Sequence, residues 1–325
     1  MADHAVDVDN DGDIFIYRGG RAPHRYITHA RIDKSIDEIE DWAFSLCERL
    51  LTVDTHDGIR RVGQNAFRRC RSLKGINFKS AVEIDEWAFS ECDNLESAEF
   101  GDRLETIGYF AFSECDSLKH LKLPSIITIR YLAFDCCRAL MDIDFSERLQ
   151  TIGKGAFNNC ERLQRIVIPL KRDLFVFNEI LQRYTQFDKC EQLTTVDLLG
   201  QAHTKTIASL HMDCWRAEMI AEIDRINQVL PNTSANEKAD EIQQWMESVI
   251  DKLDHYKAEH YRYVNEGITL LELALWKAKL DERKDNATEE SSKMKEDAGR
   301  ARKESRMLCG ADMVIKNVLS FLQLD

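Results

Sequence analysis

The side chains with the most chemistry to offer are the ten cysteines of this 325-residue chain. Seven of them recur at spacings of 23, 22, 23, 22, 23 and 30 residues. This column consists of Cys47, Cys70, Cys92, Cys115, Cys137, Cys160 and Cys190. Zinc needs ligands that converge on one point, whereas a column runs them in a line, and the chain has no Cys-x-x-Cys pair. The sequence therefore predicts no metal and no other cofactor.

Disulfides within the column are not excluded by distance, because neighbouring strands lie about 4.8 Å apart and a bridge fits that spacing. We expect instead that each thiol is a small, buried apolar side chain in a reducing compartment. The N-terminus, residues 1–13, is acidic and lacks the basic and apolar stretches of a secretory signal. These features predict a cytoplasmic protein, unless a signal has been removed.

Residues 1–13 also contain an aspartate series that resembles the start of a calcium-binding EF-hand loop. Asp7, Asp9, Asp11 and Gly12 match that loop, but its twelfth position is Arg18 where a glutamate is required. No helix fits before Asp7. We therefore interpret residues 1–13 as a flexible acidic arm.

Histidine supplies one suggestive pair, His255 and His260 with Glu259 between them. Zinc ligands on a helix need a spacing of four residues, and this pair is five apart. No hydrolase, P-loop, kinase or dinucleotide motif accompanies it. We predict that the chain is not an enzyme. The alternative is an unrecognised site where the repeats meet the helices, near His203, His211 and Cys214.

The cysteines belong to a longer phrase that repeats every 22 or 23 residues. Each copy carries Ala-Phe three residues before the cysteine, a leucine three residues after it, and an isoleucine or valine five residues before the phenylalanine. The phenylalanines are Phe44, Phe67, Phe89, Phe112, Phe134 and Phe157, with Phe187 in a worn last copy. One such unit cannot bury its apolar side chains alone, but stacked copies form a continuous core.

Two local structures follow from this phrase. The Leu-x-x-Ile-x-Phe segment ends with the alternation of a short strand, which would pair in parallel with its equivalent in the next copy. The Ala-Phe-x-x-Cys segment has the spacing of a tight helical turn. Gly63, Gly108 and Gly153 follow the isoleucine column in alternate copies, and we attribute them to turn geometry.

This pattern, I-x(4)-F-x(2)-C-x(2)-L-x(2)-I, resembles the BspA-like class of leucine-rich repeats over residues 27–199. The resemblance implies a binding solenoid and names no chemistry. The copies lack the asparagine column of commoner leucine-rich repeats, so no asparagine ladder is expected. The array followed by a helical tail also looks like leucine-rich repeat proteins found in many copies in diatoms.

The chain therefore divides into four parts of an α+β protein. Residues 1–13 form the arm, 14–35 an N-terminal cap, 36–199 a leucine-rich repeat solenoid of about six to seven repeats, and 200–325 an all-α helical C-terminal region. In the last part, one amphipathic helix is expected from Ile207 to Pro231. Residues 235–285 form one long helix or two, and a final stripe runs from Met307 to Leu322.

Side chains between the core positions of the strands should point onto the exposed sheet face of the solenoid. Varied, mixed-charge residues on a rigid platform suit protein recognition. The expected binding residues are His29, Arg31, Thr52, Asp54, Asn77, Ser97, Glu99, His120, Lys122, Asp142, Asp144, Arg165, Thr195 and Asp197. Gly75 and Val167 occupy the remaining positions.

These observations favour a non-enzymatic scaffold that binds an unknown protein through this face. The helical region would bind a second partner or form a homodimer through coiled-coil or bundle packing. The chain has 26 basic and 34 acidic residues before residue 201 and 18 and 23 after it, so nucleic acid is a poor ligand. No apolar run is long enough to span a membrane. A surface adhesion module is a further alternative.

Overall fold

The computed structural model describes residues 14–22, 26–175, 184–199, 202–210 and 212–290. Of residues 202–203 and 281–290 it describes the backbone alone. The expected acidic arm (1–13) and the stripe from Met307 to Leu322 lie outside these ranges. Contacts divide the chain into two compact units, one that holds residues 1–201 and 220–250 and one that holds residues 202–219 and 251–325.

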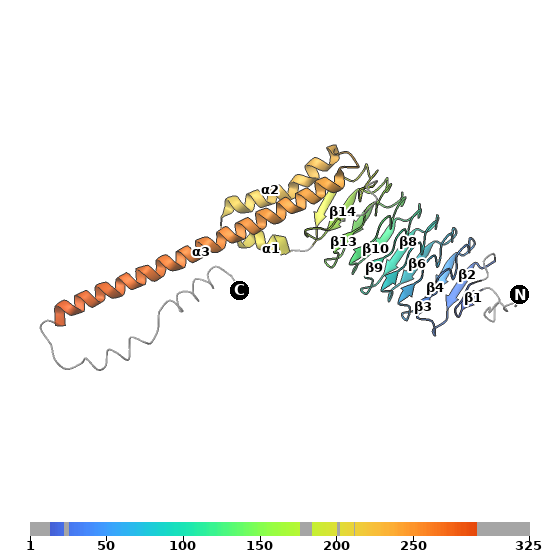
Figure 1. Cartoon of the computed structure of the whole chain (residues 1–325), viewed down its shortest axis with the longest axis horizontal. Helices are drawn as coiled ribbons and strands as arrows, with labels where there is room; N and C mark the ends of the chain where they lie inside the picture. The colour runs from blue at the N-terminus through green and yellow to red at the C-terminus, as the bar shows by residue number, and fades with distance from the viewer. Residues whose placement is uncertain (1–13, 23–25, 176–183, 200–201, 211, 291–325) are drawn as a thin grey trace. The chain divides into compact units, whose positions relative to one another are not determined.

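The first unit is a parallel β solenoid, which confirms the predicted repeat fold (Figure 1). One strand per copy follows the leucine column and forms the sheet face. These strands are β1 (Ile14–Tyr17), β2 (His29–Ile32), β4 (Thr52–Asp54), β6 (Gly75–Phe78), β8 (Ser97–Phe100), β10 (His120–Lys122), β12 (Asp142–Asp144), β14 (Arg165–Ile168) and β15 (Thr195–Leu198). They pair in three segments, β1-β2-β4, β6-β8-β10 and β12-β14-β15.

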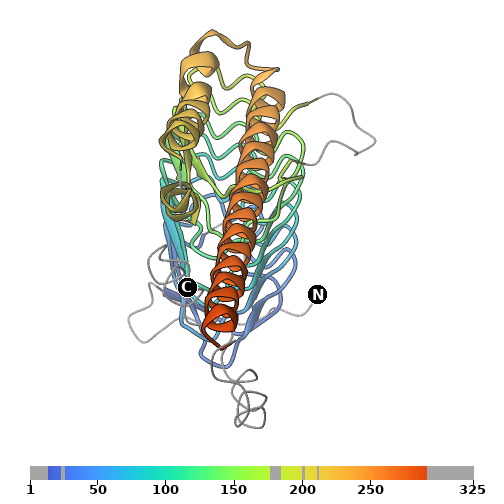
Figure 2. The same ribbon diagram turned by 90° about the vertical axis from the view of Figure 1, so that its left-hand side faces the viewer.

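A second sheet of two-residue strands, which we did not predict, runs along the isoleucine column. It consists of β3 (Glu38–Ile39), β5 (Arg61–Val62), β7 (Glu83–Ile84), β9 (Thr106–Ile107), β11 (Thr128–Ile129) and β13 (Thr151–Ile152), paired in that order. Each turn of the solenoid therefore crosses two sheets. Figure 2 looks along the stack and shows the successive turns one behind another.

The core is a column of phenylalanine rings between these sheets. The rings of Phe44, Phe67, Phe89, Phe112, Phe134 and Phe157 stack on their neighbours at centroid distances of 4.9 to 5.3 Å. The last step, from Phe157 to Phe187, is wider at 5.8 Å. The phenylalanine rings, the cysteines and the leucines of the repeat columns are all fully buried. Burial of such apolar groups is the main stabilising term of the solenoid.

The Ala-Phe-x-x-Cys segment is not the helical turn that its spacing suggests. Local bonds such as Cys47 N–H to Phe44 O are present, but alternate N–H groups donate to the next copy, as Phe44 N–H does to Ala66 O at 2.7 Å. Residues on both sides of each Ala-Phe pair have positive φ, for example Trp42 at 64° and Leu46 at 65°. The segment is therefore a stacked ladder of turns, in which each copy bonds to its neighbour.

Copies of two kinds alternate along the array. The step from the strand core position to the isoleucine column is nine residues from Val53 to Val62 but eight from Ile76 to Ile84, and this alternation continues through the array. Gly63, Gly108 and Gly153 follow the longer steps. A Cβ on them would lie 2.5 to 2.6 Å from the preceding copy. Their φ angles are not positive, so close approach, and not turn geometry, explains these glycines.

Helices follow the array. They are α1 (Ala202–Ser209), α2 (Asp213–Val229), the 3-10 helix η1 (Leu230–Asn232) and α3 (Lys238–Glu290). The single helix expected before Pro231 is thus two helices, and Cys214 at the start of the second is exposed. The Arg216 guanidinium hydrogen-bonds both the Leu210 carbonyl and Asp213 at this break. The open question over residues 235–285 is answered by one unbroken helix.

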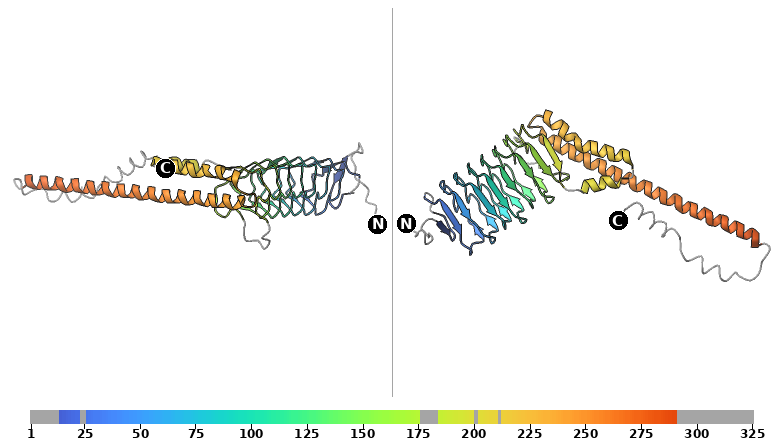
Figure 3. Two further views of the ribbon diagram at one scale, coloured as in Figure 1. Left: turned by 90° about the horizontal axis from the view of Figure 1, so that it is seen from above. Right: turned by 180° about the vertical axis from the view of Figure 1, so that it is seen from behind.

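The compact unit that holds the solenoid extends past residue 199 to include residues 220–250 (Figure 3). Lys238 is buried and donates to the backbone carbonyls of Cys190, Glu191 and Leu193 at 3.0, 2.8 and 2.7 Å. Asn227 accepts the N–H of Val196 on the edge strand β15 at 2.8 Å. Side chains of α2 and α3 thus satisfy backbone groups that a further copy would otherwise bond.

The second unit contains α1, the start of α2 and most of α3. Trp215 stacks on Tyr256 with ring centroids 5.1 Å apart, and the Tyr256 hydroxyl donates to Glu218. That hydrogen bond raises the pKa of Tyr256 to about 12. Leu253, Tyr256 and His260 are buried, whereas large apolar side chains from Tyr261 to Leu280 are exposed.

Candidate functional site

The strand register aligns the expected binding residues in two columns across the sheet face. His29 lies beside Thr52, Gly75 beside Ser97 and then His120, and Asp142 beside Arg165 and then Thr195. The second column pairs Arg31 with Asp54, Asn77 with Glu99 and Lys122, and Asp144 with Val167 and Asp197. The structure therefore brings these side chains together on one face, within three separate strand segments.

Each cation of this face contacts a carboxylate of a neighbouring copy. Arg31 Nε lies 3.5 Å from Asp54, and Lys122 Nζ lies 2.9 Å from Glu99. The hydrogen bond and charge of Lys122 lower the pKa of Glu99. All these side chains are substantially exposed, so each pair adds about 0–1 kcal/mol to stability. The pairs fix the positions of the side chains more than they stabilise the fold.

The last segment of the face carries a denser cluster. Arg165 lies 3.1 Å from Asp144 and 2.7 Å from Asp197, with Asp142 in the adjoining register position. Its hydrogen bond to Asp197 raises the pKa of Arg165. Three cations and five carboxylates among the expected residues give the face a formal charge of −2. A partner would meet a mixed-charge surface with a small acidic excess.

Two positions of the face are less accessible than the alternation of the strands predicts. Val167 is buried, although its position in the strand points it outward. Asn77 is half-buried, and its side-chain oxygen is inaccessible and lacks a hydrogen-bond partner. The accessible part of the face is carried by Arg31, Thr52 and Asp54 at one end and by other exposed polar residues further along, namely His120, Lys122, Asp142 and Asp144.

The repeat cysteines make a contact that the sequence did not indicate. From Cys70 onward, each thiol of the column lies within hydrogen-bonding distance of the phenylalanine carbonyl of the preceding copy. The pairs are Cys70–Phe44, Cys92–Phe67, Cys115–Phe89, Cys137–Phe112, Cys160–Phe134 and Cys190–Phe157, at 2.9 to 3.3 Å. The sequence analysis expected no asparagine ladder. In this solenoid a ladder of cysteine thiols bonds the backbone of neighbouring copies. The weak S–H donor bonds a buried backbone acceptor.

These thiols are poorly suited to chemistry. Burial raises the pKa of Cys47 to about 12 and that of Cys70, Cys115, Cys137 and Cys160 well above the usual range. The thiolate is the nucleophile and the metal ligand, so a raised pKa makes both roles unfavourable. All nine described cysteines are free.

The second sheet borders a cavity of about 420 Å³, which we did not predict. Arg61 pairs with Glu38 and Asp85 there and lies 3.4 Å from Asp41. Burial raises the pKa of the Asp85 carboxyl, against the opposing charge of Arg61. On the far side of Gly108, Arg130 lies 5.3 Å from the ring centroid of Tyr109. Arg61 is paired with carboxylates here, and the lining of this cavity contains no cysteine, histidine, serine or threonine.

A row of aromatic side chains runs along the neighbouring turns. Trp87 stacks on Phe110 at 4.1 Å, Phe110 meets Tyr131 edge to face at 5.5 Å, and Arg68 lies over Trp87. Trp42 belongs to the same column and is 44% exposed. The sequence indicated this row by the large side chain directly before several Ala-Phe pairs, a pattern that the sequence analysis did not use.

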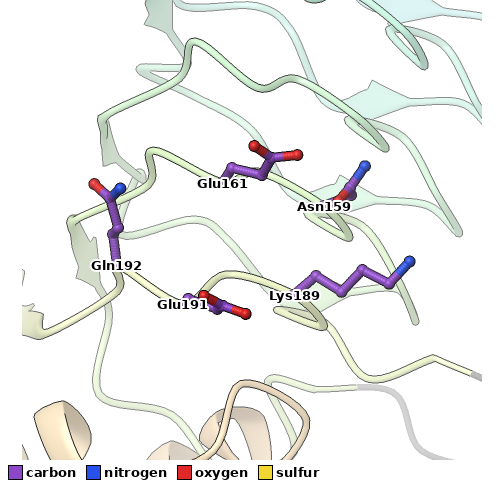
Figure 4. Close-up of a pocket in the computed structure, with 5 residues that line it drawn as sticks. All are labelled: Asn159, Glu161, Lys189, Glu191 and Gln192. Carbon is purple, nitrogen blue, oxygen red and sulfur yellow. The ribbon is translucent and has the colours of Figure 1, made fainter.

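A second cavity, of about 370 Å³, opens between the last two copies (Figure 4). Asn159 and Glu161 line one side, and their equivalents Lys189 and Glu191, with Gln192, line the other. It lies where the repeat spacing lengthens to 30 residues and the phenylalanine stack widens. The cavity is polar and holds no cysteine, histidine or hydroxyl nucleophile.

The alternative enzyme site is not assembled by the described residues. Cys214 is exposed, while His211 and the side chain of His203 lie outside the described part. His255 is exposed and His260 is buried, so the pair does not share a face. Among the described residues, no three His, Cys, Asp or Glu side chains are grouped to hold a metal ion. None of the described helices is both long and apolar enough to cross a membrane.

A solenoid in which each copy adds one strand to a parallel sheet face, with a buried leucine column behind it, is typical of the leucine-rich repeat class. Within this class, the family model for the BspA type leucine rich repeat region matches residues 24–128 and 82–211, with six copies. These matches cover more than half of the chain, which therefore belongs to the BspA type leucine-rich repeat family. This result confirms the resemblance found in the sequence. No curated protein sequence matches the chain.

Part of the chain is similar to leucine-rich repeat proteins whose structures have been solved. A leucine-rich repeat protein of T. pallidum is 24% identical, with a TM-score of 0.39, and the match covers 59% of this chain and 77% of that one. One from Bacteroides ovatus is 24% identical, with a TM-score of 0.34 and coverage of 53% and 61%. A leucine-rich cell surface protein of Faecalibacterium prausnitzii is 20% identical, with a TM-score of 0.33 and coverage of 54% and 64%. The resemblance to diatom proteins stays a prediction.

Proposed function

We propose that this protein is a non-enzymatic scaffold that binds another protein through the sheet face of the solenoid. The observation that carries the proposal is the alignment of exposed, mixed-charge side chains in two columns on a rigid core. Repeat solenoids present extended surfaces of this kind to macromolecular partners. Charge patterns on such surfaces set partner choice and association rate more than affinity.

The described cavities and thiols support a binding role over catalysis. The cavities at Asp85 and at Lys189 are lined by polar and charged side chains without a cysteine, histidine, serine or threonine, and the repeat thiols are buried with raised pKa values. We propose further that the protein works in a reducing compartment such as the cytoplasm, since its described cysteines are free. The helical region would supply a second binding surface, for another protein or for a second copy of the chain.

A matched pair of charge variants tests the role of the sheet face. Asp142→Lys with Thr52→Arg places positive charge at two exposed positions of the face, neither of which forms an ion pair with a described residue. Asp102→Lys with Gln150→Arg makes the same charge change at exposed positions outside the face strands. Each protein is immobilised, and stoichiometric partners from the native lysate are identified by mass spectrometry after crosslinking.

We expect the wild-type protein and the second variant to recover the same partner, and the face variant to lose it, because like charges or mismatched groups cost several kcal/mol at an interface. Circular dichroism and the midpoint of urea unfolding should be unchanged in both variants. Equal recovery by all three proteins would refute binding through the sheet face. Recovery of no stoichiometric partner by any of them would refute the scaffold.

A further inference from the structure

The cavity of about 420 Å³ beside the second sheet carries a further inference. Small-molecule sites usually have volumes of about 300–1,000 Å³. Side chains of five successive copies line this cavity, from Asp41 to Arg130, and six of them are charged. Tyr109 supplies an aromatic ring and Gln64 an amide. A cavity of this size and polarity suits a small ligand that carries several charges.

One cation of the lining is already engaged. Arg61 pairs with Glu38 and Asp85 and lies 3.4 Å from Asp41. These carboxylates belong to the copies on either side of Arg61, so the guanidinium joins them along the second sheet. The charges that are available to a ligand must therefore come from the other lining residues.

The next positions along the second sheet leave two carboxylates unpaired. The strand register places Glu83 between Arg61 and Thr106, and Thr106 is short and uncharged. Glu83 and Glu86 are both exposed, and neither forms an ion pair with another described residue. Burial is the main cause that raises the pKa of the Asp85 carboxyl, and the nearby charge of Glu83 raises it further. This part of the cavity therefore favours a cation.

A guanidinium without a carboxylate lies at the opposite end of the cavity. Arg130 is exposed and forms no ion pair with another described residue. Its described contacts are with Tyr109, whose ring centroid is 5.3 Å away and whose hydroxyl is 3.4 Å away. Gly108, in the copy between Asp85 and Arg130, adds no side chain to the space between them. Two steps of roughly 4.8 Å, about 10 Å in all, separate the copies of Glu86 and Arg130.

We propose that this cavity binds a free basic α-amino acid, the class to which lysine and arginine belong. Such a molecule carries two cations and one carboxylate, which are opposite in sign to the three unpaired charges of the lining. The carboxylate accepts hydrogen bonds from the Arg130 guanidinium, and the α-ammonium and side-chain cation donate to Glu83 and Glu86. Charge-assisted hydrogen bonds of about 2.7–2.9 Å at both ends, with the ligand between them, span the separation of about 10 Å.

Each of the three charges discriminates against a simpler ligand. A diamine would leave Arg130 unpaired beside a cation, and a neutral amino acid would leave one carboxylate unpaired. A peptide that ends in lysine lacks the α-ammonium at that residue. Specificity of this kind comes from groups that the wrong ligand leaves without a partner. Because these side chains are exposed, added salt should weaken the binding.

This inference goes beyond the proposed function and does not involve the sheet face. Glu83, Glu86 and Arg130 lie beside the second sheet, whereas the face variant changes Thr52 and Asp142. The two experiments can therefore fail separately.

Calorimetric titrations of the full-length chain at low ionic strength test the proposal. The first probe is L-lysine, and the others each lack one of its charges. Cadaverine lacks the carboxylate, L-norleucine lacks the side-chain ammonium, and the lysine of Gly-Gly-Lys lacks a free α-ammonium. Wild-type protein should bind L-lysine at least about tenfold more tightly than each of the other three.

Charge variants then assign the contacts. Arg130→Gln should weaken L-lysine binding about tenfold and should not weaken cadaverine binding. Glu83→Gln combined with Glu86→Gln should weaken L-lysine binding further, because it removes both anions. Arg162→Gln and Glu147→Gln remove the same charges at exposed positions outside the cavity and should change nothing. The urea midpoints of all variants should match that of the wild type, since none of the changed side chains forms an ion pair with a described residue.

Three results would overturn the proposal. One is a wild-type chain that binds neither L-lysine nor L-arginine at millimolar concentration. Another is equal binding of L-lysine and cadaverine with no effect of Arg130→Gln, which would show that the acidic excess attracts any cation. The third is equal binding of L-lysine and Gly-Gly-Lys, which would assign the cavity to the C-terminus of a partner protein instead of a free amino acid.

Discussion

At the scale of the residue, the cysteine column is more specific than an apolar position. The thiol of Cys115 fills the space between copies and bonds the Phe89 carbonyl at 3.2 Å. That carbonyl belongs to the turn ladder and is buried, so the contact ties side chain and backbone of adjacent copies. Sequence spacing identified the column as buried. It could not identify the acceptor, because the Phe carbonyl turns toward the next thiol only in the stacked turn.

Replacing Cys115 with alanine should lower the free energy of unfolding by about 1–3 kcal/mol. The substitution removes a buried sulfur, leaves a void and withdraws a hydrogen bond. Cys136→Ala is the matched control, since Cys136 is half-buried and bonds side chains, and it should cost less than half as much. Urea unfolding followed by circular dichroism measures both. Equal losses at the two positions would contradict a special role for the column.

At the scale of the element, periodicity predicted the face strands and missed the second sheet. The face strands carry alternating apolar residues over several positions, as Ile76 and Phe78 do in β6. Strands such as β3, Glu38–Ile39, have only two residues and show no alternation. They form because the stacking of the copies brings their backbones together. The same stacking aligns the outward-pointing residues of successive face strands, so the predicted residues lie side by side on one surface.

The turn segment was missed for a different reason. Positive φ at Trp42, Trp87 and Phe110 carries no sequence signal, because non-glycine residues rarely adopt it. The left-handed conformation costs roughly 1–2 kcal/mol per residue. Each such residue donates its N–H to the next copy, as Trp87 does to Tyr109 O at 2.9 Å. Repetition of these bonds along the array offsets the local strain.

The helical element that begins at Lys238 should stabilise the last copy. Lys238→Met removes donors from three backbone carbonyls and should lower the free energy of unfolding by about 1–3 kcal/mol at neutral pH. Lys257→Met, at an exposed position of α3, is the control. It should change the free energy of unfolding by less than about 0.5 kcal/mol, which is usual for a surface substitution. Urea unfolding monitored by circular dichroism measures the difference.

The pH dependence of the same lysine has a definite sign. Burial lowers the pKa of Lys238 from its ordinary value of 10.5. Between the lowered pKa and 10.5 the unfolded chain binds more protons than the folded chain, so stability from this group rises with pH. Lys238→Met should remove that rise. A stability curve of unchanged slope in this range would contradict the buried ammonium.

At the scale of the molecule, the C-terminal end of the array needs groups that bond its last copy. Turns inside the array bond neighbouring copies on both sides through the turn ladder and the second sheet, whereas β15 belongs to the last copy and pairs with β14 alone. On the other side, Asn227 and Lys238 supply the acceptor and donors. The sequence analysis ended the solenoid at residue 199. It did not anticipate that residues 220–250 share the compact unit, because their stripes resemble those of any bundle helix.

A chain that ends at residue 199 should therefore behave differently from one that ends at residue 250. The shorter chain exposes β15 and the buried side chains of the last copy, and it should self-associate and melt at a lower temperature. The longer chain keeps the whole first unit and should remain monomeric. Size-exclusion chromatography with thermal melts compares the two. A shorter chain as stable and as monomeric as the longer one would show that the helices do not close the array.

The alternation of long and short copies has a consequence for how such a protein can be built. At Gly63, Gly108 and Gly153 the backbone of the preceding copy leaves no room for a Cβ, for example at Gly108, where a Cβ would lie 2.6 Å from the Asp85 carbonyl carbon. The repeating unit is therefore a pair of copies, one long and one short, and we expect the gene to gain or lose copies two at a time. Loss of a glycine copy alone would place two copies with side chains at this position next to each other, so we expect changes in repeat number to favour whole pairs.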